Sequence, residues 1–334
     1  MDPLTQGVLG ASLSQSMSKK QHLIIAGFFG LISGMAPDLD VLIHSQSDPL
    51  LFLEFHRQFT HSLLFIPIGS CMCALVLHPL FGKKRGLSYR QSWLYCAFGY
   101  GTHALLDACT SYGTQLFWPI TTERFAWNTV SVIDPVFTLP ILVLVVFSIL
   151  KRNPWHARAA LVWALLYPTL GMIQRDRAED AGWQLAHERQ HQPIRLSAKP
   201  SFANILVWKV VYETDEHFHV DAVRVGSSVK RYPGESIKKL DVARDFPWLD
   251  PHSQQAKDIE RFRHFSNGFI ARHPTDELRI IDVRYSMVPN QLSALWSIRL
   301  SQAADVDAHA EYSTHRDNTQ ASRDTFLGML FDTP

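Results

Sequence analysis

The sequence predicts an α-helical membrane domain over residues 1–173, followed by a mostly antiparallel β extramembrane domain. Three observations predict this arrangement. Long apolar runs fill the first half, the connections between these runs alternate in positive charge, and the second half is polar with short β-rich runs. The mean hydropathy of -0.04 averages two unlike halves, so each half is considered separately.

The first half contains five apolar runs. Each has about 15 to 20 residues, against the roughly 20 needed to cross a hydrocarbon core. Core helices of a large soluble α-domain are the alternative interpretation. The runs cover residues 22–36, 62–81, 93–109, 132–150 and 157–173.

Positive charge in the connections favours membrane-spanning helices over core helices of a soluble domain. Lys and Arg gather near residues 19–20, 83–90 and 151–158, whereas 37–60 and 111–131 carry one Arg each. This alternation is the positive-inside pattern of a bacterial inner-membrane protein. It indicates a multi-pass protein of the cytoplasmic membrane that holds its polar C-terminal half outside the cytoplasm.

The second half is expected to form a separate strand-rich domain over 174–300 and a polar tail over 301–334. A polar helix is expected first, over 175–192. Alternating or β-rich runs then predict the strands. These runs cover residues 203–212, 217–225, 262–272, 278–287 and 293–300.

Charge and cysteine content exclude several functional classes. The net charge is +1 and there is no long Lys/Arg stripe, so charge gives no support for nucleic-acid binding. All four cysteines lie in apolar segments, which is typical of neither a disulfide framework nor a zinc ribbon. Nothing in the sequence identifies a protein partner.

His and Asp residues occur at metal-ligand spacing near the ends of three apolar runs. Ionisable groups at membrane depth are costly unless they pair or coordinate something. The charge pattern, which makes no use of His or Asp, places all of these residues on the outer face. The candidate metal ligands are Asp38, Asp40, His56, His61, His103 and Asp107.

Local spacing supports a shared ion. His103 and Asp107 are four residues apart, so on a helix they lie on one face. A hydrogen-bonded pair is the alternative. Thr60 is a candidate N-cap for the run that follows it, and Asp134 either caps its helix or supports the site. Mixed His and carboxylate ligation suits zinc, with manganese or iron as alternatives.

Three residues are candidates for direct roles in chemistry: Asp40, His56 and Arg57. One or two divalent ions would lower the pKa of bound water and polarise a phosphoryl or acyl oxygen. A carboxylate that is not used as a ligand would serve as base. Arg57 can bind an anionic group such as a phosphate, or can instead extend toward the membrane surface or pair with Glu54.

Four motifs carry a resemblance to a known family: Met-Asp-Pro-Leu-Thr-Gln at 1–6, Ala-Pro-Asp-Leu-Asp at 36–40, His-Arg-Gln-Phe-Thr-His-Ser at 56–62, and the Gly-x3-His-x3-Asp element at 99–107. Over about residues 1–140 they resemble the YdjM-like family of bacterial inner-membrane proteins, which are classed as metal-dependent hydrolases. The last element is also similar to a zinc-binding helix of zinc-dependent phospholipase C. The resemblance implies a membrane-bound hydrolase that acts on a lipid or phosphoester.

One position departs from the family pattern. Many relatives carry His where this chain has Gln6, so an expected ligand is replaced by an amide that can hydrogen-bond to a metal-bound water. The resemblance also implies a further helix over 3–17. The number of transmembrane helices is therefore five or six.

Two other functional classes remain open. The same residues could bind an ion in a transporter or metal-binding membrane protein without doing chemistry. Alternatively, a closed four-ligand site could hold a structural metal in a scaffold. Clustering of the ligands near one face, and the lack of a paired broken-helix repeat, favour the enzyme.

Overall fold

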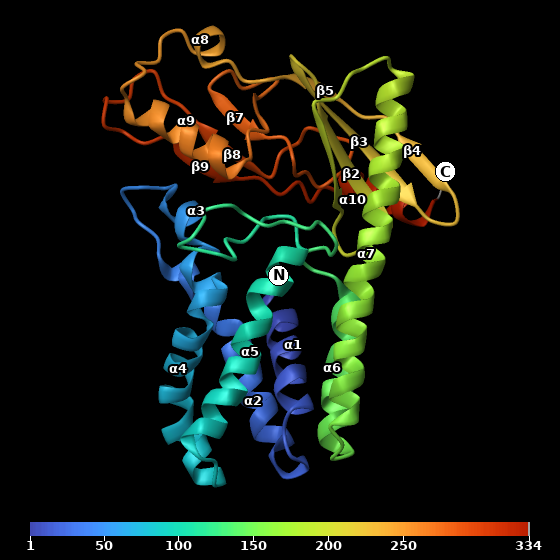
Figure 1. The fold of residues 1–334 in the computed structure, drawn as a ribbon. Coiled ribbons are helices and arrows are strands. Elements are labelled where there is room, and N and C mark those ends of the chain that lie inside the picture. Colours follow the sequence, from blue (N-terminus) through green and yellow to red (C-terminus); the bar gives the residue numbers. More distant parts are fainter. Residues whose placement is uncertain (333–334) are drawn as a thin grey trace. The chain divides into compact units, whose positions relative to one another are not determined.

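The computed structural model describes residues 1–332 and divides into two compact units (Figure 1). Unit 1 comprises residues 1–43, 55–173 and 202–204. Unit 2 comprises the remainder, including the short segment 44–54. Each unit is described on its own.

Unit 1 is helical. Each of the five apolar runs forms a helix, and the stretch near the N-terminus forms another. The helices are α1 (Pro3–Ser16), α2 (Leu23–Met35), α4 (Ile66–Leu77), α5 (Tyr89–Cys109), α6 (Pro135–Leu150) and the first part of α7 (Trp155–Glu188), with short helical turns η1 (Lys20–His22), η2 (Ala36–Leu42), η3 (Phe59–His61), η4 (Leu63–Phe65), η5 (His78–Gly82) and η6 (Lys83–Arg85).

Two helical stretches of the described residues are long and apolar enough to cross a membrane, Lys20–Leu42 and Leu63–Arg85. Helix α6 is apolar but shorter. The structure therefore confirms an N-terminal helical region with two candidate spans, followed by an antiparallel β region. The expected total of five or six spans stays a prediction.

Helix α1 is moderately polar, and its buried polar side chains form hydrogen bonds with other helices. Ser14 Oγ donates to the carbonyl of Tyr95 at 2.8 Å, and Ser12 Oγ donates to the carbonyl of Ala157 at 2.9 Å. Small residues allow this close packing: a Cβ added at Gly10 would lie 2.4 Å from the carbonyl oxygen of Gly30. Small residues and interhelical hydrogen bonds are typical of packed membrane helices.

Unit 2 contains two antiparallel sheets. In the first, the strand order is β1-β2-β3-β4, and β5 also pairs with β3; in the second, the order is β6-β7-β8-β9. The elements are α3 (Leu51–Phe55, whose last residue belongs to unit 1), β1 (Arg195–Pro200), β2 (Val207–Glu213), β3 (His217–Val225), β4 (Val229–Tyr232), β5 (Ser236–Lys238), α8 (Val242–Asp245), α9 (Gln254–Phe265), β6 (Ile270–Arg272), β7 (Arg279–Asp282), β8 (Trp296–Arg299), β9 (Glu311–Thr314) and α10 (Gln320–Phe331).

Segment 44–54 packs within unit 2. Leu50 and Leu53 are buried in a core that also contains Ile259, Phe262 and Ile298. Two ion pairs fasten the segment to α9: Arg261 contacts Asp48 at 2.9 Å and Glu54 at 2.5 Å. A short loop of the N-terminal half is thus part of the strand-rich unit.

Three expectations for unit 2 differ from the structure. The helix expected over 175–192 is not separate, because α7 continues from the apolar run until Glu188 and buries Ala178 and Leu185. The run 262–272 is a strand only at its end, since α9 occupies its start. The expected polar tail over 301–334 contains β9, which pairs with β8, and α10, whose Met329 is buried.

Candidate metal centre

Three segments of unit 1 bring the predicted ligands together. Helix α5 supplies two residues one turn apart, the turn η2 supplies two more, and the segment just before α4 supplies the last two. The ligands in this order are His103 and Asp107, Asp38 and Asp40, and His56 and His61.

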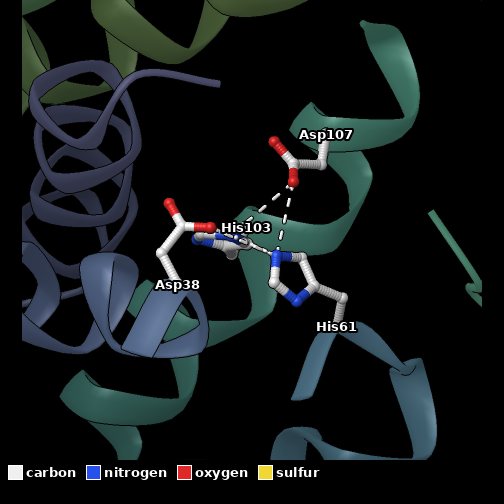
Figure 2. Close-up of side chains that lie close together, drawn as sticks. All are labelled: Asp38, His61, His103 and Asp107. Atoms are coloured by element: carbon white, nitrogen blue, oxygen red, sulfur yellow. Dashed lines mark hydrogen bonds and ion pairs between the residues drawn. The ribbon is translucent and has the colours of Figure 1, made fainter. Parts of the chain in front are cut away.

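The first cluster consists of Asp38, His61, His103 and Asp107, whose ligand atoms lie within 4.8 Å of one another. Figure 2 shows these four side chains pointing toward one another. His61 Nε2 lies 2.9 Å from His103 Nε2 and 3.3 Å from Asp107 Oδ2. Asp38 Oδ1 lies 3.4 Å from each Nε2 atom. A tetrahedral ion with metal–nitrogen bonds of about 2.0–2.1 Å holds its ligand atoms about 3.3 Å apart, so these separations suit a four-coordinate divalent ion.

Both histidines are oriented through their Nδ1 atoms. His103 Nδ1 lies 2.6 Å from the carbonyl oxygen of Gly34, and His61 Nδ1 lies 3.2 Å from Asp40 Oδ2. Because a carbonyl or carboxylate oxygen only accepts, Nδ1 of each ring carries a hydrogen, and Nε2 is the nitrogen that each ring can offer to a metal ion in the cluster. Metal-binding histidines are commonly held in this way.

Asp107 is fully buried, and one of its two carboxylate oxygens accepts no well-directed hydrogen bond. Its Oδ1 accepts hydrogen bonds from the Met1 amino group and, at 2.8 Å, from Gln6 Nε2. Its Oδ2 faces His61, with Arg57 Nε at 3.1 Å, yet among the described residues it makes no hydrogen bond of good geometry. A buried carboxylate oxygen without a well-directed hydrogen bond is costly, and a metal cation would satisfy it. The donor set therefore fits a divalent ion.

The second cluster consists of Asp38, Asp40 and His56. His56 Nδ1 lies 2.7 Å from Asp40 Oδ1, and the His56 side chain is 30% exposed. Asp40 Oδ2 accepts hydrogen bonds from the Thr60 hydroxyl at 2.7 Å and from the Arg57 main-chain N–H at 3.1 Å. Asp38 belongs to both clusters, so its carboxylate connects the buried first cluster with the more accessible second cluster.

Arg57 lies against the first cluster. Its φ of 65° is unusual for a residue with a side chain, and such backbone strain is often found at functional sites. The guanidinium donates to Thr110 Oγ1 at 3.1 Å and lies 5.2 Å from the centre of the Tyr112 ring. The alternative pairing of Arg57 with Glu54 is wrong, because Glu54 pairs with Arg261 in unit 2.

His61 lies between the two candidate spans. Burial lowers the pKa of its ring, but contacts with Asp107, Asp38 and Asp40 outweigh burial and raise the pKa of His61 to about 10. A protonated Nε2 atom has no lone pair, so a metal ion that binds to Nε2 of His61 must displace the proton from that atom.

Three supporting residues can now be placed. Gln6 contacts Asp107 and so lines the site. Thr60 is not the expected N-cap: Ser62 caps the turn η4, and Thr60 instead donates to Asp40. Asp134 lies in neither cluster, because its carboxylate caps α6 and accepts a hydrogen bond from Tyr167 at 2.9 Å.

Sequence reasoning missed two groups that hold residues of the site in place. The carbonyl of Gly34 carries no residue-specific signal, because any residue offers a main-chain oxygen. Thr110 follows the α5 motif directly, and that proximity is the signal that could have identified it as a partner of Arg57.

Comparison with known proteins agrees with these motifs. The family described as YdjM inner membrane protein matches residues 1–178. The inner membrane protein YbcI of Escherichia coli (strain K12) is 33% identical over 109 residues, which are 31% of this chain and 61% of that protein. The chain thus spans less than two thirds of the length of this curated relative. No solved structure matches this chain. Because the family match covers more than half of the sequence, this protein belongs to the YdjM inner membrane protein family.

Proposed function

We infer that this protein is a membrane-bound, metal-dependent hydrolase that acts on a lipid or phosphoester at the outer face of the inner membrane. The observation that carries this proposal is the pair of clusters that share Asp38. One cluster is buried and has the donor set of a metal site. The other is partly exposed and contains a His–Asp pair, which is a common arrangement for moving protons.

In this proposal, Asp38, His61, His103 and Asp107 hold a divalent ion. Zinc suits the mixed nitrogen and oxygen donors best, and manganese or iron would also be accepted. When bound, such an ion lowers the pKa of water and polarises a phosphoryl or acyl oxygen. Gln6 and Arg57 hold the Asp107 carboxylate in place from two sides.

The second cluster supplies the proton-transfer groups. Asp40 accepts from His56 Nδ1 and thereby orients the ring, so that Nε2 of His56 is the proposed base. Thr60 and the Arg57 main chain fix Asp40 in turn. The Arg57 guanidinium is proposed to attract an anionic substrate group. Alternatively, Asp38, Asp40 and His56 hold a second ion, as their close spacing allows.

A second candidate function is metal binding without catalysis, in a transporter or a scaffold. It is favoured by the burial of His61, His103 and Asp107, which are each 0–1% exposed. Together with Asp38 they could fill all four positions of a tetrahedral ion, and closed sites of this kind are typical of structural zinc.

Hydrolysis assays separate the two candidates. The purified protein should hydrolyse bis-p-nitrophenyl phosphate or p-nitrophenyl acetate, lose this activity on chelation and regain it with zinc or manganese. His56→Ala should slow hydrolysis by about 10²- to 10⁴-fold, the usual contribution of a general base, while bound metal is retained. His78→Ala is the matched control, because His78 contacts Ser92 and belongs to neither cluster. Stoichiometric metal without hydrolysis of any ester would favour the second candidate.

Membrane topology is a separate prediction. Alkaline phosphatase, which is active only outside the cytoplasm, should be active when fused after residue 174 or 300. It should be inactive when fused within 83–90, where Lys83, Lys84, Arg85 and Arg90 predict a cytoplasmic loop. The reverse pattern would place the ligands on the cytoplasmic face and would contradict the proposed location of the substrate.

A further inference from the structure

An apolar pocket of about 780 Å³ lies beside the second cluster within unit 1. Its volume is typical of sites that enclose a small molecule. Its walls come from the end of α2, the turn η2 and one face of α4, with Ile32, Leu39, Met72 and Val76 among the lining residues. Their side chains are all apolar, so the pocket suits a hydrocarbon group.

The polar end of the pocket is formed by candidate site residues. Asp38, Asp40 and Thr60 all line it. Tyr100 also lines it, and the Tyr100 hydroxyl donates to the main-chain carbonyl of Thr60 at 2.9 Å. A ligand in this pocket would therefore have a hydrocarbon part against α4 and a polar part near Asp38 and Asp40.

The open side of the pocket consists of residues that a membrane would cover. Helix α4 lies within the candidate span Leu63–Arg85, of which only 22% of the most apolar part is buried in the protein. Met72 and Val76 are each 59% exposed, and Leu39 is 63% exposed. In a bilayer, such surfaces contact lipid chains rather than water. A chain can thus reach the pocket sideways from the membrane.

We propose that the pocket between α2 and α4 binds an acyl chain of a membrane phospholipid and so presents the lipid's ester or phosphate group to Asp38 and Asp40. The inference rests on the proposed hydrolase function for the reaction, but the binding of the chain is independent of it. The substrate class is then a bilayer phospholipid that enters from the membrane. The polar group and the chain are recognised by different residues.

A photoreactive lipid tests this directly. The full-length protein is reconstituted in vesicles that contain a phosphatidylglycerol with a diazirine near the end of one acyl chain, and crosslinked residues are mapped by mass spectrometry. We expect saturable crosslinks on α2 and α4 at Ile32, Met72 or Val76, which an excess of unlabelled phosphatidylglycerol removes. Labelling spread evenly over every exposed apolar helix face would overturn the proposal.

Two neighbouring substitutions on α4 provide the control. Val76 lines the pocket and is 59% exposed, whereas Leu75 does not line it and is 61% exposed. Val76→Trp should fill the pocket and abolish the saturable crosslinks, while Leu75→Trp should leave them unchanged. Equal effects of the two variants would overturn the proposal. Both proteins should still bind metal, which shows that the fold is intact.

A third variant separates the two proposals. Asp38→Asn keeps the shape of the side chain but weakens a metal ligand, so it should lower bound metal and leave the crosslinks in place. If crosslinking is intact but no ester is hydrolysed, the hydrolase proposal fails and the lipid site stands. If hydrolysis of soluble esters is intact but no saturable crosslinking occurs, the lipid site fails alone.

Discussion

Replacing His103 or Asp107 by alanine should remove most of the bound metal. Each substitution deletes one of four ligand atoms that lie within 4.8 Å of one another, and burial prevents water from replacing it easily. Losing a partner that merely orients a ligand costs about 10- to 100-fold in metal affinity, so losing the ligand itself should cost more. The metal content of purified, monodisperse protein, measured by mass spectrometry, gives the result.

Two further variants make this result specific. His78→Ala removes a histidine of unit 1 that contacts Ser92 instead of the clusters, and it should keep its metal. Gln6→His places a potential ligand beside Asp107, where Gln6 now donates a hydrogen bond, so it should keep or raise the affinity. Unchanged metal content in both His103→Ala and Asp107→Ala would rule out the metal site and, with it, the hydrolase.

Replacing Leu50 by alanine should destabilise unit 2 strongly, although Leu50 lies far from the rest of that unit in the sequence. The side chain is 1% exposed and packs in a core with Ile259, Phe262 and Ile298. A buried Leu→Ala substitution costs about 2–5 kcal/mol, because apolar contacts are lost and a cavity remains. We expect a reduction of this size in the free energy of unfolding of unit 2.

Urea unfolding of the purified protein, followed by hydrogen exchange of peptides from unit 2, measures this effect. Leu327→Ala is the control, because Leu327 belongs to the same unit and is 43% exposed. Faster exchange should appear in segment 44–54 and in α9 together. If Leu50→Ala changes exchange in neither, segment 44–54 does not contribute to the core of unit 2.

Patterns within short stretches of sequence predicted the helices and the convergence of the ligands. The length of the apolar runs predicted the helical half, and the four-residue spacing of His103 and Asp107 correctly placed both on one face of α5. The charge pattern placed the other candidates near them because it fixes which connections share a membrane face. Whether these residues bind metal stays a prediction.

Other features depend on contacts that no local pattern encodes. The composition changes at residue 174, yet α7 continues, and its next turns bury Ala178 and Leu185 within unit 2. Strand β9 is short and polar, and its position follows from pairing with β8. Asp134 has the same residue type as the ligands, and only the fold shows that it caps α6.

Segment 44–54 also limits how the protein can be divided. Asp40 and His56, which contact each other in unit 1, are separated in the chain by a loop whose middle belongs to unit 2. Cutting the chain at residue 174 would leave this loop without the unit 2 residues that it packs against. The loop would then regain conformational entropy, which would oppose the Asp40–His56 contact. The two units therefore cannot be separated by a single cut of the chain, because a cut at residue 174 leaves a part of the core of unit 2 attached to unit 1.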